Sequence, residues 1–239
     1  MVSVGGKNNI AMDKMVYKLT ESNKEIPKEF QDSEGLLKCL IVSLFDVKTG
    51  YIFYRKSERG AYLPQTERVF AYEFYRRWAD NVSKNLQNYI VNGEPEKNVS
   101  KFRNTKHQYP DLVLHHSQGD YSNQGVVCEI KRKDSLTSSN FKDDINKLYH
   151  FVCAQQCKYR FKYGVFVLVG GKMDAIFKII LKINNELLTF NENNRKLNRI
   201  ICITYDGTVL ELCHLQRIIN SSRDEMKELI NKYKNERQN

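Results

Sequence analysis

The chain has 239 residues and carries 38 Lys plus Arg against 28 Asp plus Glu, a formal net charge of +10. This length is enough for one domain with a sizeable core. Only 12 glycines and 4 prolines occur, which argues against a disordered or fibrous class. The basic balance favours a polyanionic partner, and we expect nucleic acid.

Nothing in the sequence predicts a membrane or secreted protein. The apolar run CLIVSLF at 39–45 is far shorter than the ~20 residues that a membrane-spanning helix needs. The first twenty residues lack the apolar core of a secretory signal. Six cysteines are scattered without a CxxC pair, which is typical of buried free thiols in a reducing compartment. We therefore expect a cytoplasmic protein with no membrane contact.

The first part of the chain is polar and then becomes apolar. Residues 1–26 show no periodicity, and we expect a loose or partly ordered N-terminal arm. Residues 27–47 predict a helix with an apolar end. The β-branched Ile41 and Val42 leave a strand open as the alternative from residue 38.

Residues 66–82 predict a second helix. Thr66 can cap its first turn, and aromatic residues recur every four positions behind it, at Phe70, Phe74 and Trp78. An aromatic stripe of this kind packs one helix face against a core.

Two short apolar runs follow, YPDLVLHH at 109–116 and VVCEIKRKD at 126–134. The turn-like segment between them predicts a hairpin. A helix is predicted for 141–161, and a buried strand that ends at two glycines is predicted for 163–171. The resulting order is strand, strand, helix, strand.

The C-terminal part continues the alternation of helices and strands. We predict a helix at 173–188, a hairpin at 199–213 around Asp206 and Gly207, and an amphipathic helix at 223–237. Together the elements predict a single α/β domain over 27–239, with a central mixed sheet flanked by helices and a core at about 60–215.

Acidic residues and a lysine stand in the two apolar runs. Side-chain alternation places Asp111 on one face of the first run, and Glu129 and Lys131 on one face of the second. Pairing the runs can bring Asp111 and Glu129 together, although the sequence leaves the register open. Two adjacent carboxylates repel unless a cation sits there, and oxygen ligands suit Mg²⁺ or Mn²⁺ rather than zinc. Lys131 could hold an attacking water or offset charge on a phosphate.

These residues resemble a known family. The first run contains Pro110-Asp111, the second strand ends in Glu129-Ile130-Lys131, and a helix with glutamates precedes both. This pattern looks like the PD-(D/E)XK nuclease superfamily. The resemblance covers about residues 60–170. It implies a restriction-endonuclease-like fold with a helical N-terminal extension, and a Mg²⁺-dependent phosphodiesterase, expected to be a DNA endonuclease. Asp111 and Glu129 would be metal ligands, and Lys131 would position or activate the attacking water.

The resemblance leaves some points open. A noncatalytic nucleic-acid-binding or assembly module on the same fold is the alternative function, with the acids structural. Many nucleases of this fold pair to cut two strands, which makes a homodimer compatible with the resemblance.

The family commonly adds an acid from a helix before the first strand, and two glutamates compete for this role. At about 100° per residue, Glu67 falls on the side of Phe70 and Phe74, whereas Glu73 lies about 120° away near Arg77. A ligand must face the sheet, so Glu67 is preferred as the third catalytic and metal-binding acid. Glu73 remains the alternative, and a surface ion pair would explain either.

Further residues have supporting roles in this hypothesis. Asp144 and Lys147, in the helix that follows the hairpin, are expected to lie behind the site or at the surface rather than to act in catalysis. His115, His116, His150 and His214 are expected to be structural. Basic residues that could contact phosphates, or equally be solvated, are Lys133, Arg103, Lys106, Lys158 and Arg160.

Overall fold

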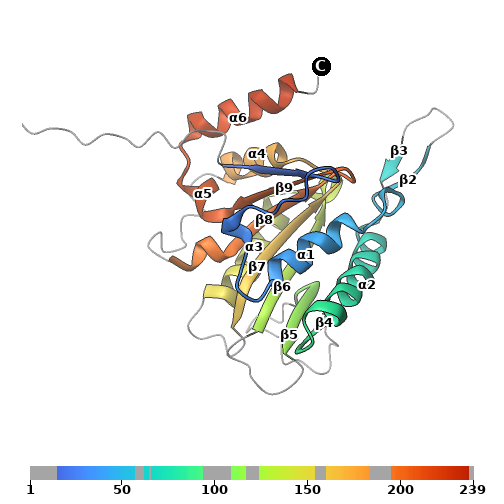
Figure 1. The fold of residues 1–239 in the computed structure, drawn as a ribbon. Helices are drawn as coiled ribbons and strands as arrows, with labels where there is room; N and C mark the ends of the chain where they lie inside the picture. The colour runs from blue at the N-terminus through green and yellow to red at the C-terminus, as the bar shows by residue number, and fades with distance from the viewer. Residues whose placement is uncertain are drawn as a thin grey trace, which may run out of the picture.

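A seven-stranded mixed β-sheet forms the centre of the protein (Figure 1), in the strand order β1-β9-β8-β7-β6-β5-β4. The computed structural model describes residues 15–56, 62–64, 66–93, 109–116, 124–153, 160–183 and 195–236. Strands β6, β7 and β8 are parallel, and the other neighbouring pairs are antiparallel. The strands are β1 (Tyr17–Thr20), β4 (Tyr89–Gly93), β5 (Leu112–His116), β6 (Gln124–Arg132), β7 (Phe161–Val169), β8 (Ile200–Tyr205) and β9 (Val209–His214).

Helices cover both faces of this sheet, which makes the protein α/β, as the sequence predicts. Helices α1 and α2 share one core with the sheet, and α3, α4, α5 and α6 share the other. A separate small hairpin, β2 (Phe53–Lys56) with β3 (Tyr62–Pro64), precedes α2. The helices are α1 (Leu36–Phe45), α2 (Glu67–Asn85), α3 (Ser138–Cys153), α4 (Met173–Ile183), α5 (Leu215–Asn220) and α6 (Arg223–Asn235).

Alternation along β5 and β6 builds both cores at once. Leu112 and Leu114 enter the core beneath α1 and α2, while Val113 and Val127 enter the core beneath α3. Each of these side chains is at most 3% exposed, and burying an aliphatic side chain of this size contributes about 1.5–3 kcal/mol. These two strands therefore contribute side chains to both cores, one on each face of the sheet.

Helix α2 confirms the prediction from the aromatic stripe. It begins at Glu67, and the Thr66 hydroxyl accepts a hydrogen bond from the N–H of Val69 at 3.4 Å. Phe70, Phe74 and Trp78 are fully buried. The cap fixes where the helix starts, and so where the side chain of Glu67 projects.

Helix α1 starts later than the sequence predicts, and the strand alternative from residue 38 is wrong. Gly35 has φ of +75°, a left-handed conformation, immediately before Leu36. The carboxylate of Asp32 accepts the N–H groups of Leu36 and Leu37 at 3.0 and 2.9 Å. These contacts satisfy two of the first backbone donors and place the start of the helix at residue 36.

Two edge strands were not predicted. β1 lies within the segment expected to be an arm and pairs with β9, and β4 pairs with β5 at the opposite edge. Each strand has four or five residues, which gives too few alternations to stand out from a polar surrounding.

The C-terminal helix and the described cysteines agree with the sequence predictions. Met226, Leu229, Ile230 and Tyr233 of α6 are buried, as the amphipathic pattern predicts. The five cysteines in the described residues are buried free thiols, and Cys157 lies outside those residues. No helix in the described part of the chain is long and apolar enough to cross a membrane.

Candidate active site

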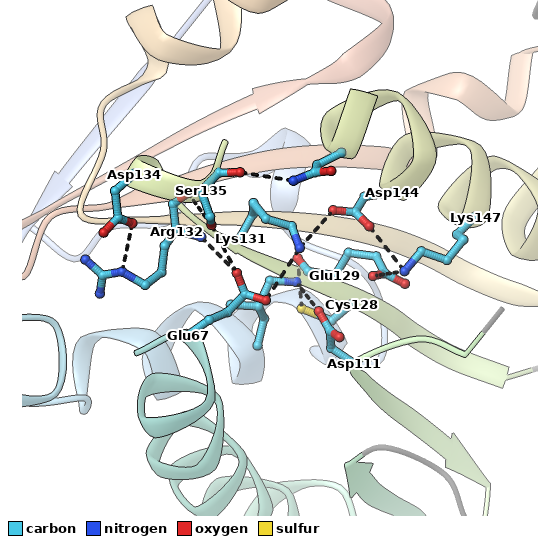
Figure 2. Close-up of polar contacts among 12 residues, drawn as sticks. Glu67, Asp111, Cys128, Glu129, Lys131, Arg132, Asp134, Ser135, Asp144 and Lys147 are labelled. Carbon is cyan, nitrogen blue, oxygen red and sulfur yellow. Dashed lines mark hydrogen bonds and ion pairs between the residues drawn. The ribbon is translucent and has the colours of Figure 1, made fainter. Parts of the chain in front are cut away.

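The β5–β6 hairpin brings the two acids of the strands together. Leu112 pairs with Cys128 and Val113 with Val127, so continuing this register sets Asp111 opposite Glu129. The Oδ2 of Asp111 also accepts a hydrogen bond from the N–H of Ile130 at 2.7 Å (Figure 2). Asp111 is therefore fixed beside the C-terminal half of β6, on the same side as Glu129.

Glu67 reaches the end of β6 from the first turn of α2. Its Oε1 lies 3.4 Å from the Nζ of Lys131, and its Oε2 accepts the backbone N–H of Arg132 at 3.2 Å. Figure 2 shows the Glu67 side chain approaching Lys131 from below, with Asp111 nearby. Three separate stretches of the chain thus supply Glu67, Asp111 and the acid and lysine of β6.

Glu73 is held elsewhere on the same helix. Arg76 donates two hydrogen bonds to its carboxylate at 2.9 and 2.8 Å, and Arg77 donates one at 2.7 Å. The hydrogen bonds from Arg76, together with Arg77, outweigh partial burial and hold the pKa of Glu73 below its ordinary value. Of the two glutamates, Glu67 is the one that contacts Lys131.

Lys131 bridges the two helical layers. Its Nζ lies 3.4 Å from Glu67 of α2 and 3.5 Å from Oδ2 of Asp144 of α3. Burial alone would lower the pKa of Lys131, but the negative charges of Asp144, Glu67 and Asp111 outweigh it, so the pKa is raised. Lys131 is consequently a charged ammonium at neutral pH.

Lys147 contacts the site directly, although its sequence position favoured a supporting or surface role. Its Nζ lies 2.5 Å from Oε2 of Glu129 and 3.2 Å from Oδ1 of Asp144. Figure 2 shows Lys147 and Asp144 entering from α3, opposite Glu67. Their spacing of three on a helix indicates a shared face, but which strand residue that face meets depends on how the layers pack.

The acids of the strands lie in an environment that opposes their ionisation. Burial, reinforced by the charge of Asp111, raises the pKa of Glu129 well above its ordinary value, against the opposing charge of Lys147. Burial also raises the pKa of Asp111 to about 6, against the opposing hydrogen bond from Ile130. The Oε1 of Glu129 is buried without a hydrogen-bond partner. Ionising both acids in this buried site is therefore unfavourable unless further positive charge is present there.

The oxygen donors fit a hard divalent cation. Among the described residues, no three His, Cys, Asp or Glu side chains are grouped closely enough to hold a metal ion by themselves. Mg²⁺, however, is usually bound by one or two carboxylates, with waters and substrate phosphates completing its shell. Asp111 and Glu129 are such a pair, and the unpartnered Oε1 of Glu129 is an available donor.

The basic residues predicted to contact nucleic acid fall in different places. Lys133 is exposed and directly follows β6, next to the site. Arg160 is also exposed, but its backbone pairs with Gln124 at the far end of β6. Arg103, Lys106 and Lys158 lie outside the described residues.

The histidines make contacts within the fold. The Nε2 of His115 lies 2.8 Å from the side-chain amide of Asn92, and His116 packs against the ring of Tyr89. The ring of His214 stacks on Phe30 at 4.5 Å. Burial lowers the pKa of His150. These contacts agree with the structural role expected for His115, His116 and His214.

Comparison of the chain with protein-family models, with curated proteins and with solved structures finds no match.

Proposed function

We propose that the protein is a metal-dependent nuclease with a restriction-endonuclease-like fold that hydrolyses phosphodiester bonds, as an endonuclease on DNA. The observation that carries the proposal is the convergence of Glu67, Asp111, Glu129 and Lys131 at one end of the β5–β6 hairpin. Three carboxylates and a lysine from distant parts of the chain meet there, in a surrounding that raises the pKa of two of the acids. Such a concentration of perturbed groups is typical of functional sites.

Each residue of the candidate active site would have its own role in hydrolysis. Asp111 and Glu129 would hold Mg²⁺ or Mn²⁺, with waters and a substrate phosphate completing its shell. Glu67 would hold the ammonium of Lys131 beside this pair. When bound, such a cation polarises a phosphate and lowers the pKa of a coordinated water. The ammonium of Lys131 would orient the attacking water and stabilise negative charge that develops on the phosphate.

The arrangement of elements also supports the fold assignment. An antiparallel hairpin carries the acids, a helix follows it, and the next strand lies parallel to the second strand of the hairpin. The position of Glu67 at the start of a helix before the hairpin agrees with the additional acid that the resemblance implies.

Cleavage of plasmid DNA tests this function. The wild-type protein is expected to nick or cut the plasmid with Mg²⁺ and to leave it intact in EDTA. Asp111→Ala and Lys131→Ala are each expected to lower the rate by about 10²-fold or more, the effect typical of losing one electrostatic contact to a transition state. Lys227→Ala, at an exposed position of α6, is the matched control and should cleave at the wild-type rate. Cleavage that survives both site substitutions would contradict the assignment.

A noncatalytic nucleic-acid-binding or assembly module is the second candidate. The specific observation in its favour is that lysines already face the acids, with Lys147 2.5 Å from Glu129 and Lys131 3.4 Å from Glu67. An ion network of this kind can stabilise a fold without metal. Titration with Mn²⁺ in a calorimeter separates the two functions, because the nuclease requires binding that Asp111→Ala removes. Nucleic-acid binding without any Mn²⁺ binding would favour the module.

A further inference from the structure

A groove of about 710 Å³ opens beside the candidate active site. One wall is a stripe of α2 that includes Glu67, Arg68, Tyr72 and Tyr75, and the other includes Gly93 of β4 and Asp111. Glu67 and Asp111 therefore belong both to the groove and to the site. A volume between about 300 and 1,000 Å³ is typical of pockets for small ligands, which is the size range of a nucleotide.

Two tyrosines present their rings to this groove. Tyr72 is 58% exposed and Tyr75 is 36% exposed, and only Tyr51 and Ile90 are comparably exposed large apolar residues in the described chain. The same helix packs against the core through Phe70, Phe74 and Trp78. The two tyrosines are therefore not needed for core packing. Exposed aromatic rings gathered at one groove are typical of a binding surface.

Gly93 has no side chain to fill the space beside Tyr75. A Cβ at this position would lie 3.2 Å from Cδ2 of Leu112 and 3.6 Å from Cδ2 of Tyr75. The contact with Leu112 is tight, and the contact with the ring of Tyr75 is an ordinary van der Waals distance. A side chain at this position would therefore press on Leu112 and fill space beside the ring of Tyr75.

Side chains of both charges line the groove. The guanidinium of Arg68 lies 5.8 Å from the ring centroid of Tyr72, so a cation and an aromatic face stand together at the groove's wall. Glu67 and Asp111 line the same groove. A phosphate of a bound strand could contact Arg68 without a metal ion, whereas a phosphate placed at the acids would need a divalent cation between them.

We propose that the groove holds one or two unpaired nucleotides next to the phosphate that is cut, with Tyr72 and Tyr75 stacking on bases and Arg68 contacting the backbone. Bases in a duplex are covered on both faces by their neighbours, whereas unpaired bases offer a face to an aromatic ring. This role rests on the proposed function and narrows its substrate class to single strands or to duplexes, such as a supercoiled plasmid, that contain locally unpaired nucleotides.

Fluorescence anisotropy tests the groove without cleavage. The probes are a labelled single strand of about 16 nucleotides of mixed sequence and the duplex that it forms with its complement. Both are titrated with protein in EDTA, where metal-dependent hydrolysis does not proceed. The double variant Tyr72→Ala/Tyr75→Ala is expected to bind the single strand about 10- to 100-fold more weakly, because each base stacked on an aromatic ring contributes that order of affinity. Duplex binding is expected to stay within about twofold of wild type.

Two control variants separate stacking from other effects. Tyr72→Phe/Tyr75→Phe keeps both rings and is expected to bind the single strand like wild type. Tyr51→Ala removes an exposed tyrosine that does not line the groove and is expected to leave both affinities unchanged. Circular dichroism of the double alanine variant checks that its fold is retained.

The outcomes distinguish this proposal from the nuclease itself. Unchanged single-strand binding in the double alanine variant, an equal loss for both probes, or no binding of either probe would each overturn the groove's role. If the wild-type protein cleaves plasmid but any of these results is obtained, only the groove assignment fails. If single-strand binding depends on the tyrosines but no nuclease activity is found, the groove stands and the catalytic function fails.

Discussion

At the scale of single residues, Asp111 gives the protein a defined pH dependence. Burial raises its pKa to about 6 in the folded chain, above the ordinary value of about 3.9. The folded state therefore binds this proton more tightly than the unfolded state does. It follows that the free energy of unfolding contributed by Asp111 is largest below about pH 4 and is lost as the pH rises through about 6.

This linkage can be measured by urea unfolding of the metal-free protein. In the wild-type protein, titration of Asp111 is expected to lower the free energy of unfolding by on the order of 2 kcal/mol between pH 4 and pH 6.5. Asp111→Asn is expected to abolish this decrease. The amide cannot ionise, while its oxygen can still accept the N–H of Ile130. Glu129 remains in the variant and contributes its own pH dependence. Superimposable profiles for wild type and Asp111→Asn would show that Asp111 does not titrate in this window.

At the scale of secondary structure, the start of α2 positions Glu67. The Thr66 hydroxyl accepts the N–H of Val69, and Glu67 is the first residue of the helix. Thr66→Ala removes this cap and is expected to lower the free energy of unfolding by about 1 kcal/mol. Fraying of the first turn would also displace Glu67 from Lys131, so we expect plasmid cleavage to slow more than it does for a cap lost elsewhere.

Ser222→Ala provides the matched control for this prediction. Ser222 caps α6 in a similar way, with its hydroxyl accepting the N–H of Glu225 at 3.1 Å, and α6 does not contribute to the site. Urea unfolding should show a similar loss of stability for both variants. Equal cleavage rates in the two variants would mean that the α2 cap does not act through Glu67.

Elements with a strong local sequence pattern were predictable, and elements with a weak or interrupted pattern were not. Three aromatic residues, Phe70, Phe74 and Trp78, recur every four positions in α2, a spacing that places them on one helix face. Strands β5 and β6 are apolar runs on either side of a turn-like segment. Gly35 interrupts the first predicted helix because one left-handed residue ends a regular run, whatever the surrounding composition. Strand β1 pairs with β9 near the other end of the chain, and β4 pairs with the next strand, β5, across an intervening segment. In both cases the partner strand stabilises a conformation that the short local sequence does not encode.

The same distinction applies to the candidate site. The closeness of Asp111 and Glu129 follows from a local hairpin, so alternation could anticipate it. The direction of Glu67 follows from helical periodicity. The contact between Lys147 and Glu129 instead depends on how α3 packs on the sheet. Neither the helical period of α3 nor the alternation along β6 predicts how α3 is rotated about its axis above the sheet.

At the scale of the whole molecule, the site lies where all three layers meet. Glu67 comes from the α2 layer, Asp111 and Glu129 from the sheet, and Lys147 from the α3 layer. A cation that bound Asp111 and Glu129 would therefore require the assembled fold and would have little affinity for the unfolded chain. Binding of this kind stabilises the folded state by mass action.

Thermal unfolding with Mn²⁺ tests this coupling. At a concentration about 100 times the dissociation constant, a single cation adds about 2.7 kcal/mol to the free energy of unfolding. For a domain of this length, that increment raises the melting temperature by about 5–10 °C. The increase should be larger at pH 7.5 than at pH 5, because ligands must be deprotonated to bind a metal and Asp111 has a pKa of about 6. Asp111→Asn should show little increase at either pH, whereas the noncatalytic module predicts an unchanged melting temperature in the wild-type protein as well.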